Sequence, residues 1–177
     1  DASTRDVDDV VGVAYALVQT GLVAGTRALV VAGDAALARG LTTREEVDAV
    51  ARGYAHSRGI GRVRATIGCL DGRSESPGES LARHVILLLG YAVTPQVTVV
   101  THGCTYRLDM VIDGTKVAIE FDGKSKYRGP DDLMAEKVRE ERLKAAGWYV
   151  VRFVWADLSN PELIRSRIEG ALAWSRT

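Results

Sequence analysis

The sequence predicts an α/β protein in which a helical region precedes a mixed α/β domain. Up to residue 73, apolar residues recur at the spacing of amphipathic helices. After residue 73, helical segments alternate with short apolar segments that are typical of β-strands. The polar, turn-rich segment "LDGRSESPG" separates the two patterns. We therefore expect a helical region over residues 1–73 and a second domain over residues 74–177.

The N-terminal region is rich in Ala, Val, Leu and Arg, and its periodicity indicates about four helices. Within it, the segment "TTREEV" has the form of a capping box, in which Thr43 is the N-cap and Glu46 follows three residues later. A helix is therefore expected to begin at this point.

The second domain is predicted to have the element order αβββαβα. Its first helix has Ser76 as cap and Pro77 at the first helical position, and it stops at Gly90. The segments "QVTVV", "TYRLDMVI" and "KVAIEFD" indicate strands, and the "HG" and "DG" pairs between them are typical of hairpin turns. A helix in "DDLMAEKVREERLKAAG", a strand in "WYVVRFV" and a helix in "NPELIRSRIEGALAW" complete the order. The strand "WYVVRFV" is too apolar for a sheet edge by this pattern, and the sheet is expected to be mixed.

Composition excludes several classes of protein. Lys+Arg and Asp+Glu both number 23, so no overall charge indicates a partner, and any charged site must be local. Cys69 and Cys104 are far apart and lack metal-ligand spacing, which predicts buried reduced thiols rather than a zinc site. The longest apolar stretches are too short to span a membrane, and no secretion signal opens the sequence. A cytoplasmic protein without a membrane partner is expected.

Three carboxylates are expected to share one face of the sheet. If the Asp-Gly pair at 113–114 forms a two-residue hairpin turn, Asp109 lies opposite Ala118. Glu120 is then the diagonal neighbour of Asp109 on the same face, at roughly 7 Å between backbones. Asp122 extends the row. The opposite face of these strands is apolar, as expected for a face covered by a helix.

Carboxylates held this close disfavour each other's ionised form unless a cation or a proton intervenes. The sequence therefore predicts a Mg²⁺ or Mn²⁺ site formed by Asp109, Glu120 and Asp122, with water and substrate phosphate completing the coordination. Lys124 and Lys126 follow directly and are candidates to position the attacking water or to stabilise charge on the phosphate. The alternative is that these acids only form a solvated strand end.

Three further residues have two readings each. Glu79 is either the capping partner of Ser76 or an additional acid that reaches the metal. Lys137 and Arg139 either lie on the solvated face of a charged helix or contact DNA phosphates.

The segments "YRLDMVI", "VAIEFDGKSKY", "EKVREERLKAAGW" and "VVRFVWADL" occur in this order within residues 75–158. Together with "RSESPGES" at 73–80, they resemble the PD-(D/E)XK, or restriction-endonuclease-like, superfamily, and within it the bacterial group related to very-short-patch repair endonucleases. Residues 1–72 resemble the helical region of AbiEi-type antitoxins. In actinobacterial relatives a winged-helix segment precedes that region. The first residue here is Asp1 rather than Met, which suggests a fragment, a processed chain or a trimmed chain.

The resemblance implies a metal-dependent DNA endonuclease domain that hydrolyses phosphodiester bonds, with Asp109, Glu120 and Asp122 as its acids. The lysine that the superfamily name implies two residues after the acid is here Asp122, so Lys124 or Lys126 substitutes for it or the site is impaired. The alternative function is a catalytically inactive nuclease fold that serves as the DNA-binding or interaction module of an antitoxin-like transcriptional regulator. DNA, a second copy in a homodimer and a toxin are the expected partners.

Overall fold

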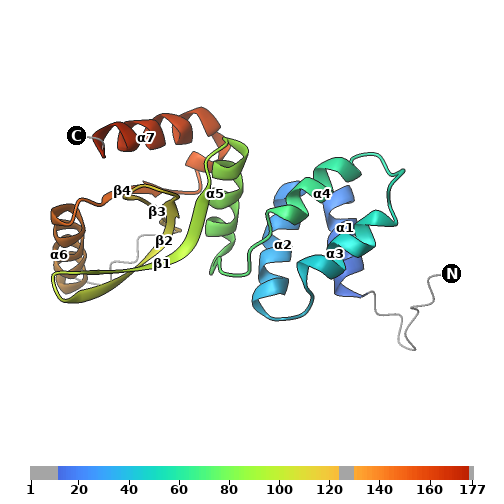
Figure 1. The fold of residues 1–177 in the computed structure, drawn as a ribbon, viewed down its shortest axis with the longest axis horizontal. Helices are drawn as coiled ribbons and strands as arrows, with labels where there is room; N and C mark the ends of the chain where they lie inside the picture. The colour runs from blue at the N-terminus through green and yellow to red at the C-terminus, as the bar shows by residue number, and fades with distance from the viewer. Residues whose placement is uncertain (1–11, 124–129, 176–177) are drawn as a thin grey trace. The chain divides into compact units, whose positions relative to one another are not determined.

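The computed structural model describes residues 12–123 and 130–175. The chain divides into two compact units, Asp1–Ser80 and Leu81–Thr177 (Figure 1). This division lies in the first turns of helix α5 (Pro77–Leu88), beyond the boundary predicted after residue 73.

No helix within the described residues is long and apolar enough to cross a membrane.

The first unit is a helical bundle, as the apolar spacing predicted. Its helices are α1 (Val13–Val23), α2 (Thr26–Ala38), α3 (Arg44–Arg52) and α4 (Ile60–Gly68). Their apolar faces form one core that includes Val18, Leu29, Val47, Val63 and Ile67. Close packing explains Gly33 in α2, because a Cβ atom there would lie 2.6 Å from Cδ2 of the buried Leu70.

The predicted capping box at the start of α3 is confirmed. The backbone N–H of Glu46 donates to Oγ1 of Thr43 at 3.2 Å, and the backbone N–H of Thr43 donates to Oε2 of Glu46 at 2.9 Å. Hydrogen bonds from the Thr42 hydroxyl and then from the Thr43 N–H lower the pKa of Glu46. Because the folded-state pKa is lowered, the contribution of the Glu46 carboxylate to stability is present above its unfolded pKa and is lost as the pH falls through the lowered value.

The second unit is an α/β fold with the predicted order αβββαβα. After α5 follow β1 (Val93–Thr101), β2 (Cys104–Ile112), β3 (Val117–Phe121), α6 (Pro130–Ala145), β4 (Tyr149–Phe153), a 3₁₀ turn (Asp157–Ser159) and α7 (Pro161–Trp174). The strands lie in the order β1-β2-β3-β4. β1, β2 and β3 are antiparallel, and β4 runs parallel to β3, so the sheet is mixed as predicted.

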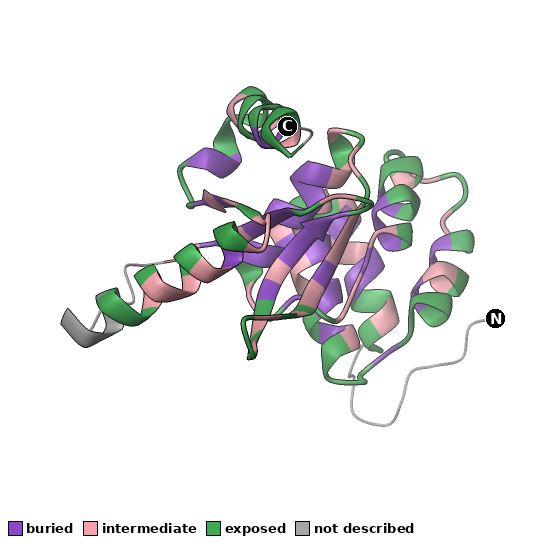
Figure 2. Ribbon diagram, turned by 60° about the vertical axis from the view of Figure 1, so that its left-hand side comes forward, coloured by how far each residue is buried: buried purple, intermediate pink, exposed green. Residues whose placement is uncertain are grey.

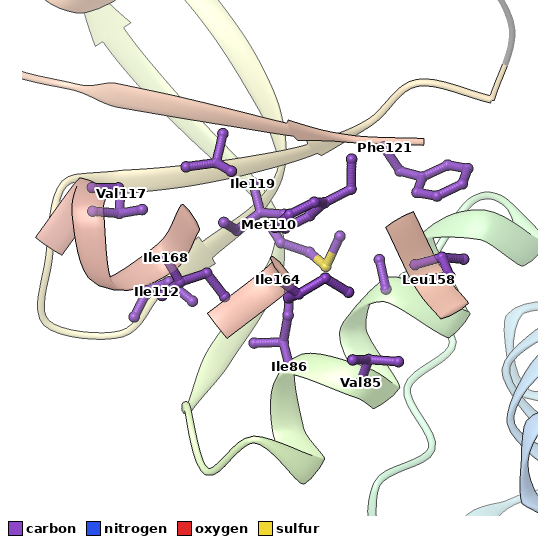
Figure 3. Close-up of a cluster of buried hydrophobic side chains, with 14 residues drawn as sticks. Val85, Ile86, Met110, Ile112, Val117, Ile119, Phe121, Leu158, Ile164 and Ile168 are labelled. Atoms are coloured by element: carbon purple, nitrogen blue, oxygen red, sulfur yellow. The ribbon is translucent and has the colours of Figure 1, made fainter. Parts of the chain in front are cut away.

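Helices cover both faces of this sheet (Figure 1). On one face, α5 and α7 pack against side chains that include Met110, Ile119 and Phe153, as Figure 3 shows for part of this cluster. On the other face, Leu143 of α6 packs with Val111 and Ala118. Buried residues are concentrated in β2, β3 and α5 (Figure 2).

The prediction that the last strand is too apolar for an edge position is wrong, because β4 ends the strand order. Its apolar character has another cause. Val151 and Phe153 belong to the cluster formed with α5 and α7, whereas Val150 packs against the cluster that contains Leu143 of α6. An edge strand that is covered on both faces needs apolar residues at successive positions, as a central strand does.

The predicted register between β2 and β3 is also wrong. The observed pairs are Met110↔Ile119 and Val111↔Ala118, so β3 is shifted by two residues relative to the prediction. The cause is Thr115, which belongs to the turn rather than to the strand. Its hydroxyl donates to the carbonyl of Ile112 at 2.8 Å and accepts a hydrogen bond from the N–H of Val117 at 3.1 Å. Because the shift is even, every side chain keeps its predicted face.

Replacing Thr43 by Ala is expected to destabilise the protein by about 1 kcal/mol, because the N–H of Glu46 loses its acceptor at the start of α3. Urea unfolding followed by circular dichroism measures the change. Thr43→Ser is the matched control, since it keeps the hydroxyl. Equal stability of the Ala and Ser variants would contradict the capping role.

Candidate active site

A polar pocket of about 230 Å³ lies in the second unit, between the sheet and α6. It is lined by Asp109, Glu120, Phe121, Asp122, Glu136, Arg139 and Arg152. The three acids that the sequence predicted on one face therefore line the same pocket. Four carboxylates and two guanidinium groups give the lining a formal charge of −2 among the described residues.

Asp109 is connected to the strand beside it through the backbone. Its Oδ2 accepts a hydrogen bond of 2.9 Å from the N–H of Phe121, just beyond the last β2–β3 pair, Met110↔Ile119. The carboxylate thus satisfies a donor of a buried residue where the ladder has ended. Asp109 is therefore partly structural, rather than an exposed acid that contributes only repulsion.

The backbone on the other side of Asp109 is strained. The β1–β2 ladder runs through Pro95↔Met110 and resumes at Val97↔Leu108, and Gln96 between these pairs has φ = 54°. A non-glycine residue in this region costs on the order of 1–3 kcal/mol, and such strain is enriched at functional sites. The strain lies beside the pocket acid, which is consistent with a functional role for this end of β2.

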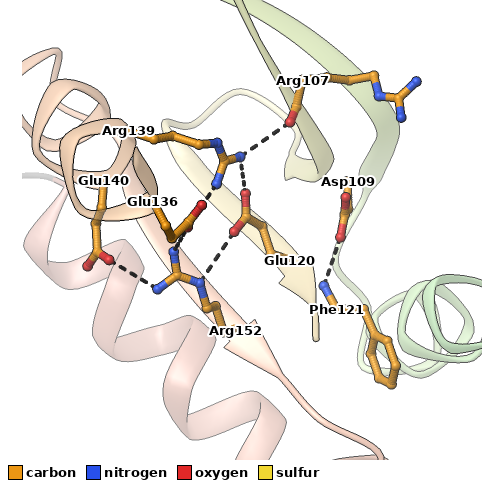
Figure 4. A network of polar contacts seen from close by, with 8 residues as sticks. All are labelled: Arg107, Asp109, Glu120, Phe121, Glu136, Arg139, Glu140 and Arg152. Atoms are coloured by element: carbon orange, nitrogen blue, oxygen red, sulfur yellow. Dashed lines mark hydrogen bonds and ion pairs between the residues drawn. The ribbon is translucent and has the colours of Figure 1, made fainter. Parts of the chain in front are cut away.

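Glu120 is compensated by two arginines. Arg139 of α6 forms an ion pair through Nη2 with Oε1 of Glu120, and Nε of Arg152 lies 3.4 Å from Oε2 (Figure 4). The Glu120 side chain is only 13% exposed, so its charge needs such partners. The predicted mutual repulsion of the acids is thus relieved by arginine at Glu120.

Two further glutamates of α6 join the same arginines (Figure 4). Oε1 of Glu136 lies 3.2 Å from Nη1 of Arg139 and 2.6 Å from Nη2 of Arg152. Oε2 of Glu140 lies 3.1 Å from Nη1 of Arg152. We call these five residues, Glu120, Glu136, Arg139, Glu140 and Arg152, the arginine–glutamate network. It connects α6 to β3 and β4.

The network keeps its arginines charged. Burial of the Arg139 guanidinium lowers its pKa, but the hydrogen bond to Glu120 and the charges of Glu120 and Glu136 outweigh burial, so that its pKa is raised overall. Arg152 shows the same balance, with Glu140, Glu120 and Glu136 opposing burial and raising its pKa. Because both pKa values are raised, these arginines stay charged up to strongly alkaline pH. Deprotonation of the arginines removes the contribution of the ion pairs to stability only there.

The pocket offers a small set of oxygen donors to a hard divalent cation. Among residues 12–123 and 130–175, no group of three His, Cys, Asp or Glu side chains is arranged to hold a metal ion. Mg²⁺, however, is commonly bound by one or two carboxylates, water and substrate phosphate. Asp109 and Asp122 line the pocket and supply that number, and Glu120 adds a third carboxylate if it leaves an arginine.

The remaining predicted site residues are placed as follows. Lys124 and Lys126 lie outside the described residues. Glu79 accepts hydrogen bonds from the Ser76 hydroxyl at 2.8 Å and from the N–H of Glu75 at 3.0 Å, and its own N–H donates to Oγ of Ser76. These hydrogen bonds support the interpretation of Glu79 as the capping partner of Ser76. Lys137 is exposed on α6, whereas Arg139 contacts the pocket acids.

The sequence interpretation missed Glu136 and Arg152 as site residues. A signal for Glu136 was available, because it lies three residues before Arg139 and four before Glu140, on one face of α6. Arg152 is the paired neighbour of Glu120 in the parallel β3–β4 ladder. That pairing depends on a register between segments that are distant in the sequence, which local patterns do not specify.

Comparison with known proteins gives two curated relatives. They are uncharacterized proteins of Mycobacterium tuberculosis, from strain CDC 1551 / Oshkosh and strain ATCC 25618 / H37Rv, and each is 30% identical over 139 residues. The match covers 76% of this chain and 51% of each relative, so the chain spans about half the length of the curated relatives it matches. No family model matches the chain, and no solved structure matches it significantly.

Replacing Asp109 by Ala is expected to destabilise the protein by about 1–3 kcal/mol, because the N–H of the buried Phe121 loses its acceptor. Asp109→Asn retains a carbonyl oxygen and should cost less. Urea unfolding of both variants measures the difference. If the Ala variant is as stable as the Asn variant, the hydrogen bond does not support the end of β3.

Proposed function

We propose that the unit formed by residues 81–177 is a metal-dependent DNA endonuclease domain of the restriction-endonuclease-like type. The observation that carries this proposal is the convergence of Asp109, Glu120 and Asp122 on one pocket. They come from β2, from β3 and from the residue after β3, so no single segment accounts for their proximity. A solvated strand end would not require Glu120 to be largely buried.

The proposed chemistry assigns a role to each group. Asp109 and Asp122 would hold Mg²⁺ or Mn²⁺ in the pocket. When bound, the cation supplies a hydroxide nucleophile near neutral pH and stabilises charge on the phosphate oxygens. Glu120 contributes its carboxylate under the control of the two arginines. Lys124 or Lys126 would assist the attack of water on phosphorus, in which the new P–O bond forms as one ester P–O bond breaks and the departing sugar oxygen takes up a proton.

One observation favours a second candidate function. Glu120 is engaged by Arg139 and Arg152, and such pairing can replace a cation in a fold that no longer cleaves. The second candidate is therefore a non-cleaving nuclease fold that serves as the DNA-binding or interaction module of an antitoxin-like regulator. Lys137, which is exposed on α6, is its candidate phosphate contact.

The wider setting belongs to the same proposal. We infer a cytoplasmic protein that acts on DNA, forms a homodimer and, through residues 1–73, meets a toxin partner. The resemblance of the sequence motifs to restriction-endonuclease-like proteins, and of residues 1–72 to the helical region of AbiEi-type antitoxins, supports these assignments. These assignments concern the whole protein, and the part of each curated relative that matches this chain is only about half of that relative.

Incubation of the protein with supercoiled plasmid and Mn²⁺ tests the first proposal. The wild type is expected to nick plasmid, and Asp109→Asn should reduce the rate by at least about a hundredfold, because it removes a charged ligand of the cation. Lys124→Met, Lys126→Met and the double variant identify the assisting lysine. Lys144→Met is the matched control, since Lys144 lies on α6 and does not line the pocket.

The outcomes separate the two candidates. Equal nicking by the wild type and by the double lysine variant would remove both lysines from the mechanism. DNA binding without nicking in either Mg²⁺ or Mn²⁺ would contradict the nuclease and support the non-cleaving module. Loss of that binding in Lys137→Met would then place the DNA contact on α6.

A further inference from the structure

The two oxygens of Glu120 are held unequally, and this inequality carries a further inference. We propose that Arg152 competes with a divalent cation for Oε2 of Glu120, whereas Arg139 retains Oε1 and orients the carboxylate. The inference rests on the proposed metal site and adds that Arg152 regulates the affinity of this site for the cation. Arg139 is a positioning residue in this arrangement, and Arg152 is an exchangeable one.

Arg139 is fixed by contacts on three sides. It pairs with Oε1 of Glu120, lies 3.2 Å from Glu136, and donates from Nη2 to the carbonyl of Arg107 at 3.3 Å. Its side chain is 21% exposed. An arginine held by two carboxylates and a backbone carbonyl loses several interactions if it moves. The Arg139–Glu120 contact is therefore the lasting one.

Arg152 is held differently. Of its three ion pairs, the contact of 3.4 Å with Glu120 is the longest, against 2.6 Å with Glu136 and 3.1 Å with Glu140. If the Glu120 contact opens, Arg152 retains two carboxylate partners. Its side chain is also the more exposed of the two arginines, at 34%. Release of Oε2 consequently leaves neither Arg152 nor Glu120 without a compensating charge.

Such an exchange changes the apparent affinity for a cation. A dication in the pocket is attracted by Asp109 and Asp122. The third carboxylate, Glu120, has its Oε2 occupied by Arg152. The apparent affinity equals the intrinsic affinity multiplied by the fraction of molecules in the binding-competent arrangement. Removing the charge of Arg152 removes both the competition and the repulsion between Arg152 and the cation.

The test measures Mn²⁺ binding by electron paramagnetic resonance on the full chain. Arg152→Met is expected to bind Mn²⁺ about fivefold to tenfold more tightly than the wild type, which is the scale of one partly exposed ion pair. Arg152→Lys keeps the charge and should stay near the wild type. Arg165→Met is the matched control, because Arg165 is also ion-paired in this unit but does not line the pocket.

Two further variants locate the effect. In the Arg152→Met background, Glu120→Gln should abolish the gain, since the released oxygen no longer carries charge. Arg139→Met should gain less Mn²⁺ affinity than Arg152→Met, because the relief of repulsion is offset by loss of the residue that orients the carboxylate. Thermal unfolding verifies that each variant is folded. If Arg152→Met does not fold, Arg152→Gln replaces it in the binding measurement, because Gln is neutral but retains hydrogen-bond donors.

The possible results are distinguishable. If the wild type binds Mn²⁺, Asp109→Asn does not, and the neutral Arg152 variants bind as the wild type or more weakly, the competition is refuted and the metal site stands. If the neutral Arg152 variants bind Mn²⁺ and the wild type does not, Arg152 excludes the cation from the wild-type pocket and the competition is supported. If neither the wild type nor any Arg152 variant binds Mn²⁺, the metal site and the inference are both overturned.

Discussion

The need to compensate one charge in a strand that is covered on both faces constrains which residues α6 and β4 place beside β3 in the second unit. Val117, Ala118 and Ile119 of β3 are fully buried, because α5 and α7 cover one face of the sheet and α6 covers the other. Such a strand is expected to be apolar throughout. Glu120 interrupts this pattern, and a carboxylate in that position is tolerated only with opposite charges beside it. Arg152 from the paired strand and Arg139 from α6 provide them.

The attachment of α6 follows from the same constraint. Of its residues 134–145, Leu143 is the buried one, so the helix has a small apolar contact with the sheet. The arginine–glutamate network supplies a further connection, from Glu136, Arg139 and Glu140 to β3 and β4. Arg142 adds hydrogen bonds to Cys104 and Tyr106 of β2. Ion pairs therefore help to hold one wall of the pocket in place. A charged ligand in the pocket would act on the groups that position this wall, which links binding to the arrangement of α6.

Local sequence signals predicted the helices and strands well, but they did not predict the strand register or the tertiary ion pairs. Thr43, Pro77 and Gly90 mark helix ends through the backbone groups that they satisfy or leave open, so they can be read from neighbouring residues alone. The hairpin between β2 and β3 was misjudged because Thr115 is a good strand former that forms turn hydrogen bonds instead. The three acids were nevertheless found on one face, since the error in register was even. The arginines opposite Glu120 depend on tertiary packing, and no short segment contains that information.

Phe121 shows how closely the pocket is coupled to the core. Strand alternation directs Glu120 and Asp122 to the pocket and places the Phe121 ring in the core, where it meets Trp155 edge to face with centroids 5.1 Å apart. The N–H of the same residue is bound by Asp109. One residue thus fixes the spacing of the acids on either side of it and ties them to β2 and to the apolar cluster. Because Asp109 completes this connection, the geometry of the proposed cation site and the stability of the end of β3 depend on the same carboxylate, and a substitution there alters both.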